Sequence, residues 1–97
     1  MDITPTENDG TFAGSAAVVA IGLMHFVFPT AFEPLNRWLG FTENTRRYVY
    51  ANGAVETAIG LLLARPGTRP ISASLGAAYG LYLAVHALPA ALRRASA

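Results

Sequence analysis

Apolar residues occupy three long runs of the chain, and charged residues fall between these runs. Residues 10–32 and 70–92 contain no Asp, Glu, Lys or Arg, and residues 48–64 contain only Glu56. A helix rises about 1.5 Å per residue and the hydrocarbon core of a membrane is about 30 Å thick, so runs of this length can each cross once. The pattern predicts three transmembrane helices, at about residues 12–29, 46–64 and 70–91.

The segments outside these runs complete a single helical membrane domain over residues 12–94. Residues 1–11 form a polar, acidic tail, and residues 95–97 form a short C-terminal tail. Residues 33–41 mix apolar and charged side chains, which predicts a short amphipathic helix lying in the membrane interface, with an ordered loop as the alternative. The expected fold class is therefore an all-α integral membrane bundle of three transmembrane helices with this interfacial helix between the first and the second.

The composition agrees with a membrane protein and excludes several other classes. Only 13 % of the residues are charged, roughly half of the ~25 % typical of soluble domains, while 53 % are hydrophobic. A net charge of +1 without any Lys gives no basic face for nucleic acid. There is no Cys, no phosphate-binding loop and no zinc motif, so we expect no metal site, no covalently bound cofactor and no enzymatic activity from the chain alone.

The arginines predict the orientation of the chain in the membrane. The connection between the first two runs and the C-terminus together carry more Arg than the turn at residues 65–70, and the N-terminal tail carries none. Since cytoplasmic segments are enriched in Arg and Lys, the N-terminus is expected outside and the C-terminus in the cytoplasm.

Polar side chains inside the predicted helices are the candidates for a functional site, because such side chains are costly in lipid. Counted from the charged ends of each run, they fall at a similar depth and can form one polar layer: His25, Asn52, Glu56, Tyr79, Tyr82 and His86. A carboxyl group and an imidazole in such a layer could exchange protons or bind a polar ligand. The alternatives are a hydrogen bond that only holds the helices together and a contact to another subunit.

Small residues at four-residue spacing mark the faces on which helices can approach closely. They are Gly53 and Gly60 in the second helix and Ser72, Gly76, Gly80 and Ala84 in the third. We expect the second helix to pack against the third through these faces, with a contact between two copies of the chain as the alternative.

Two motifs resemble those of the small DoxX-like membrane proteins. The first helix ends in His25-Phe-x-x-Pro29-x-x-Phe32, and the second carries Gly53-x-x-Glu56-x-x-x-Gly60-Leu-Leu-Leu. The resemblance implies an integral protein of the bacterial plasma membrane, with His25 and Glu56 as the matched polar positions and a quinone as the candidate cofactor. The chain differs in lacking the fourth helix of that family and its Pro-Ala-Asn pattern near the end of the third.

These observations lead to three hypotheses of function. The first is a subunit of a membrane complex, redox-linked according to the resemblance. The second is a homo-oligomeric carrier of protons or small solutes that uses Glu56, and the third is a purely structural accessory subunit. The expected partners are the lipid bilayer and other membrane subunits or copies of the chain.

Overall fold

The structure, a computed structural model, describes residues 5–96, with side chains from Thr11 onward, and this part of the chain is helical without any strand. The elements run α1 (Pro5–Val27), α2 (Pro29–Trp38), α3 (Thr45–Leu63), a 3₁₀ turn η1 (Pro66–Thr68) and α4 (Arg69–Ser96). The all-α architecture expected from the sequence is therefore confirmed. Helix α1 begins within the segment expected to be a tail, and α4 continues beyond the end predicted for the third helix.

A sharp corner separates α1 from α2. The two helices meet at an angle of 101°, with Phe28 in a non-helical conformation between them and Pro29 at the start of α2. The first residues of a helix have no intrahelical acceptor for their backbone N–H groups, so proline, which lacks this group, is well tolerated there. Pro29 therefore favours the end of α1 and the start of α2 at this position. The short helix predicted at residues 33–41 is present, but it begins earlier and carries Pro34 inside.

Gly40 ends α2 and turns the chain toward α3. Its φ is +99°, the amide of Phe41 donates to the carbonyl of Asn36, and the amide of Gly40 donates to that of Arg37. This pair of bonds is the Schellman arrangement, in which glycine supplies the left-handed conformation. The loop that follows places Phe41 in a buried position, only 1 % exposed.

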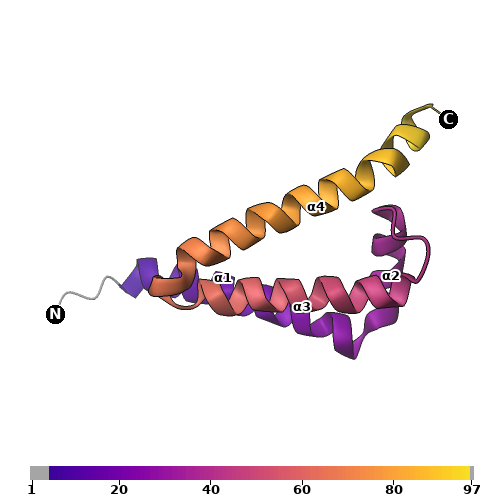
Figure 1. Ribbon diagram of the computed structural model, residues 1–97. Coiled ribbons are helices and arrows are strands. Elements are labelled where there is room, and N and C mark those ends of the chain that lie inside the picture. The colour runs from indigo at the N-terminus through magenta and orange to yellow at the C-terminus, as the bar shows by residue number, and fades with distance from the viewer. Residues whose placement is uncertain (1–4, 97) are drawn as a thin grey trace.

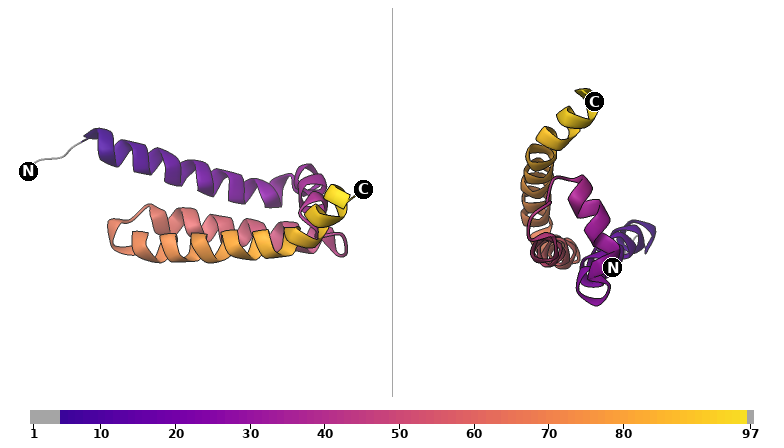
Figure 2. Two further views of the ribbon diagram at one scale, coloured as in Figure 1. Left: turned by 90° about the horizontal axis from the view of Figure 1, so that it is seen from above. Right: turned by 90° about the vertical axis from the view of Figure 1, so that its right-hand side faces the viewer.

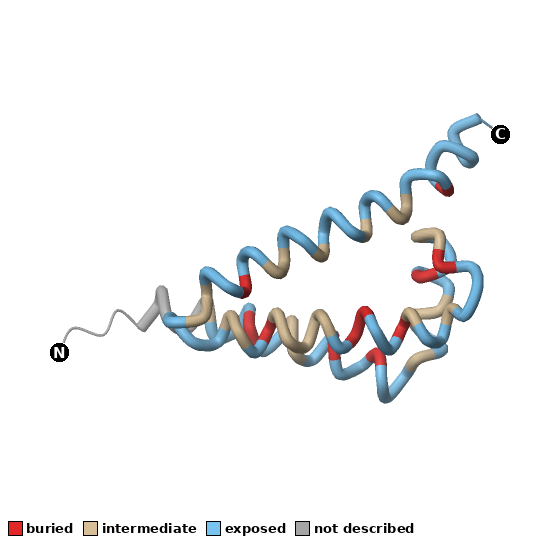
Figure 3. The backbone as a smooth tube through the Cα atoms, viewed as in Figure 1, coloured by how far each residue is buried: buried red, intermediate tan, exposed pale blue. Residues whose placement is uncertain are grey.

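The helices pack unequally. Helix α1 lies along α3 over most of its length, whereas α4 leaves the turn η1 and diverges from α3 (Figure 1). Figure 2 shows α1 and α4 on different sides of α3. Buried positions gather on α1, α3 and the loop after α2, while most of α4 is exposed (Figure 3). Helix α3 does pack against α4, as expected, but its contact with α1 is the more extensive one.

One helical stretch of the described residues is by itself long and apolar enough to cross a membrane. It is Pro66–Ser96, and very little of it is buried against the rest of the chain. The bent pair Thr11–Val27 and Pro29–Trp38 meets the same criterion only when taken together. Helix α3 does not meet it alone, and it carries the three charged residues Arg46, Arg47 and Glu56.

Candidate functional site

His25 of α1, which is buried, and Glu56 of α3, which is half-buried, form a polar pair. Nε2 of His25 lies 3.1 Å from Oε2 of Glu56. On the other side of the ring, Nδ1 lies 2.8 Å from the carbonyl oxygen of Ile21. A carbonyl oxygen only accepts, so Nδ1 carries a hydrogen, and Nε2 is the nitrogen that faces the carboxyl group. A proton shared by the pair would therefore lie between Nε2 and Oε2.

The surroundings of the pair hold it in place. The imidazole is 4 % exposed and stacks on Phe32 of α2 with ring centroids 3.8 Å apart. Oε2 of Glu56 is shielded from solvent and makes no hydrogen bond within the described residues, so the imidazole is its polar neighbour. The carboxyl group thus depends on His25 for compensation of its burial.

Glycines bring α1 and α3 close enough for this contact. A Cβ at Gly53 would collide with the side chain of His25, and one at Gly60 would lie 2.8 Å from the backbone nitrogen of Val19. Gly22 is equally close to Thr57 from the opposite helix. The hydroxyl of Ser15 donates to the carbonyl of Gly60 over 2.7 Å, across the same contact.

Asn36 and Asn52 make a second buried polar contact, between α2 and α3. Nδ2 of Asn52 donates to Oδ1 of Asn36 over 2.8 Å, and Nδ2 of Asn36 donates to the carbonyl of Phe32. Both asparagines are less than a tenth exposed. Asn52 was among the expected site residues, whereas Asn36 was not. The signal available in the sequence was the spacing of Phe32 and Asn36, which puts this amide on the same face as an aromatic residue.

His86 lies away from the His25–Glu56 pair, in an aromatic cluster formed by Phe41, Tyr48, Tyr82 and His86. The imidazole stacks on Phe41 at 3.8 Å between centroids, and the rings of Tyr48 and Tyr82 lie 6.0 and 6.1 Å from it. Its Nδ1 is 3.4 Å from the carbonyl oxygen of Leu39. The single polar layer expected from the sequence is thus divided into separate groups.

The two candidate tyrosines of α4 belong to different groups. Tyr79 is close enough to Glu56 to interact with it electrostatically, and it also contacts Tyr82 at 6.2 Å between ring centroids. Tyr82 joins the aromatic cluster through Phe41. Tyr79 and Tyr82 therefore lie near each other on α4, Tyr79 within electrostatic reach of Glu56 and Tyr82 in the aromatic cluster.

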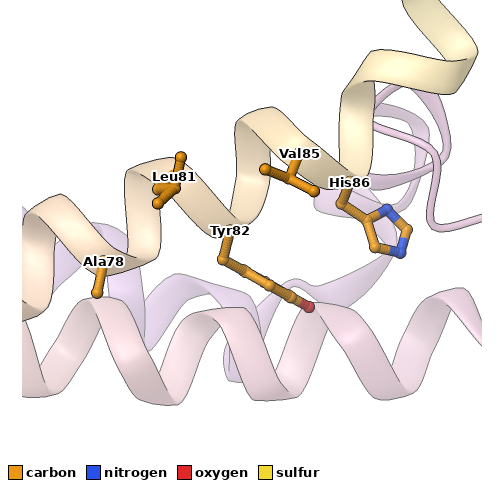
Figure 4. A pocket seen from close by; sticks show the side chains of 5 residues that line it. All are labelled: Ala78, Leu81, Tyr82, Val85 and His86. Carbon is orange, nitrogen blue, oxygen red and sulfur yellow. The ribbon is translucent and has the colours of Figure 1, made fainter.

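Three hollows follow this face of α4. One of about 280 Å³ lies between α3 and α4 and is lined by Asn52, Tyr79 and Tyr82 among apolar residues. A second, of about 350 Å³, is lined by Ala78, Leu81, Tyr82, Val85 and His86 (Figure 4). A third, of about 210 Å³, lies at the loop after α2. Neighbouring hollows share residues, so they are adjacent.

The small residues of α4 differ from those of α3. Ser72 donates to the carbonyl of Ile59 over 2.8 Å and fixes the start of α4 on α3. At Gly76 and Gly80, no atom of the described residues beyond the local turns of the helix lies within 4 Å of the position where a Cβ would stand, and Ala84 is exposed. The expected contact of Gly53 and Gly60 with the α4 glycines is therefore wrong, because Gly53 and Gly60 face α1.

Contacts at the end of α4 fix it to the loop and to α2. The guanidinium of Arg94 stands 4.4 Å from the ring centre of Trp38, and its Nη1 donates to the carbonyl of that residue over 3.0 Å. Among the described residues, no three His, Asp or Glu side chains are placed to hold a metal ion. The candidate chemistry is therefore that of the His25–Glu56 pair and the hollows beside α4.

Comparison with known proteins identifies the family. Residues 15–97 match the family described as a domain of unknown function, DUF8561, and the chain belongs to this family. No curated protein and no solved structure matches the chain.

Proposed function

We propose that this member of the DUF8561 family is a small multi-pass subunit of the bacterial plasma membrane that acts by assembling with other membrane subunits or with copies of itself. In this proposal α1, α3 and α4 cross the membrane and α2 lies at its cytoplasmic surface. The N-terminus is outside and the C-terminus is in the cytoplasm.

The observation that carries the proposal is the uncovered apolar surface of α4. Leu81, Val85 and Leu92 are each 60 % exposed or more, although this is the helix most able to cross a membrane. A soluble protein would bury such a helix in its core. Lipid and a partner helix are the surroundings in which this surface is stable.

The His25–Glu56 pair supports α3 as a further span. The two arginines of α3 lie in its first turn, where their long side chains can reach the membrane surface. Glu56 is then the one acidic group at depth, and His25 supplies its partner. A compensated carboxyl group costs far less in lipid than a lone one.

Membrane extraction and crosslinking test this proposal. The protein should stay in the membrane through alkaline carbonate washing. Because the chain has no Cys, Gly80→Cys can be crosslinked specifically, and we expect it to give dimers or adducts with another subunit. The matched control is Gly14→Cys in α1, which also has open space around it. Release by carbonate, or equal crosslinking at both positions, would refute the proposal.

The His25–Glu56 pair favours a second candidate function, proton transfer coupled to a redox complex or to solute movement. The resemblance to DoxX-like proteins, and the quinone that it implies, rests on the motifs around His25 and Glu56. Proton flux in vesicles should fall at least about tenfold in Glu56→Gln if the carboxyl group carries protons. Unchanged flux and unchanged activity of the host complex would leave a structural role for the pair.

A further inference from the structure

Two of the hollows beside α4 meet at His86 and differ in character. The hollow of about 210 Å³ is lined by the loop residues Gly40 to Glu43 together with Tyr48 and His86. The hollow of about 350 Å³ continues from His86 along α4 toward Ala78, as Figure 4 shows. The first contains a carboxylate, a hydroxyl and aromatic rings, and the second is lined almost entirely by hydrocarbon. Together they have the form of a site for an amphiphile.

The polar hollow is suited to a cation. Glu43 lines it and makes no ion pair or hydrogen bond within the described residues. Glu33, at the same end of the molecule, contacts Arg46 at 2.7 Å and Arg37 at 3.7 Å. The carboxylate of Glu43 is exposed at the surface and is open to a positive partner.

Aromatic rings add to this preference. Phe41, Tyr48 and His86 line the same hollow, with the centroids of Phe41 and Tyr48 4.7 Å apart. Phe41 is 1 % exposed and is stacked on His86, so the half-buried ring of Tyr48 is the one that can attract an ammonium group to its face. Nδ1 of His86 is directed to the carbonyl of Leu39, which leaves Nε2 as an acceptor for a donor group.

The apolar hollow is suited to a hydrocarbon chain. Leu81, Val85 and Ala78 line it and are exposed. It runs along α4 away from the end at which Arg94 contacts Trp38, a pair typical of the membrane interface. A chain placed there would point from the interface toward the membrane interior.

We propose that this site binds a membrane phospholipid with an ammonium head group, phosphatidylethanolamine, with the head group at Glu43 and Tyr48 and one acyl chain along Ala78–Val85. The site rests on the membrane location proposed above. It assigns a function to Glu43, Tyr48 and His86, which the His25–Glu56 pair does not use.

Competition between lipids tests the site. The full chain, purified in detergent, is mixed with phosphatidylethanolamine and phosphatidylglycerol of identical acyl chains, and bound lipid is measured by native mass spectrometry. We expect phosphatidylethanolamine to be retained about tenfold more strongly, and Glu43→Gln to reduce this preference to within about twofold. Glu33→Gln, which removes the same charge at the same end, should keep the preference.

A second variant tests the position of the acyl chain. Val85→Trp fills the apolar hollow at an exposed position and should lower the retention of both lipids about fivefold without unfolding the protein. Equal retention of the two lipids by the unchanged protein would overturn the proposal, as would a preference that survives Glu43→Gln. Full retention in Val85→Trp would overturn the placement of the chain.

These results are separable from the membrane proposal. If carbonate releases the protein but the protein still prefers the ethanolamine lipid, the lipid site is supported and the proposed membrane-spanning location is refuted. A protein that stays in the membrane without any lipid preference loses only the site.

Discussion

Helix α3 packs tightly against α1 but only loosely against α4. Toward α1, Gly22, Gly53 and Gly60 leave no space for even a methyl group. Toward α4, the two helices touch near Ser72 and diverge beyond it, and Gly76 and Gly80 face open space. Similar small-residue spacing therefore produces a closed contact in one place and an unoccupied surface in the other. A row of glycines therefore shows where another helix can approach closely. Which helix packs there depends on the other side chains of the same face.

The largest expected effect is at the closed contact. Gly53→Leu or Gly60→Leu forces α1 away from α3 and should destabilise the fold by about 3 kcal/mol, because the neighbouring atoms include backbone and cannot move aside. Unfolding by sodium dodecyl sulfate can be followed by the fluorescence of Trp38, the one Trp of the chain. Gly80→Leu is the control and should cause no loss of stability, because the new side chain meets open space and leucine favours a helix more than glycine does. Similar losses at both contacts would remove the contrast.

The buried pair gives the next effect. His25→Leu or Glu56→Leu leaves the other group without compensation and should cost about 2 kcal/mol. The double variant should cost less than the sum of the two, since no unpaired polar group remains. A double-mutant cycle measures this coupling, and additive losses would show that the two side chains act independently.

A smaller effect is expected at the α2–α3 contact. Asn36→Ala removes the acceptor for Nδ2 of Asn52 and should cost about 1 kcal/mol. Asn52→Ala should cost a similar amount, and the double variant little more. Thr30→Ala, at an exposed position of the same helix, should be neutral. The same unfolding measurement applies, and a loss in Thr30→Ala as large as that in Asn36→Ala would speak against the buried hydrogen bond.

The smallest effect is expected at the exposed ion pair of Glu33 and Arg46. Glu33→Gln should leave the unfolding midpoint almost unchanged, because exposed pairs are screened by water and salt. Midpoints measured at low and high salt should differ little between the variant and the unchanged protein. A large loss would mean that this pair fixes the corner between α2 and α3.

Much of the fold could be predicted from the residues that end and begin helices. The prolines and arginines at residues 65–70 end one helix and begin the next, and Gly40 ends α2, as its left-handed φ requires. His25, Asn52 and Glu56 were identifiable because polar side chains are conspicuous among apolar ones, and the structure gives each a buried or half-buried polar partner. The number of helices that cross the membrane remains a prediction.

The pairing of faces could not be predicted in the same way. Gly53 and Gly60 are compatible with either neighbour of α3, and the choice depends on Ser15, Gly22 and His25 fitting them in three dimensions. Asn36 was missed because a single amide in an amphipathic segment resembles an ordinary surface residue. His86 is separated from Glu56 because it stacks on Phe41, which a loop carries. The path of a loop cannot be predicted from the periodic spacing of apolar residues in helices.

The fixed orientation of the His25 ring has an electrical consequence. With Nδ1 committed to the carbonyl of Ile21, a proton passing between Nε2 and Oε2 creates or removes a dipole while the net charge of the pair stays constant. The distance of 3.1 Å is about a tenth of the membrane thickness, so a transmembrane voltage of 100 mV would bias this transfer by at most about 0.2 kcal/mol. Uptake of a proton from one side of the membrane would instead move a full charge through part of the field. In the proposed membrane, voltage dependence would therefore distinguish internal sharing of the proton from its transport.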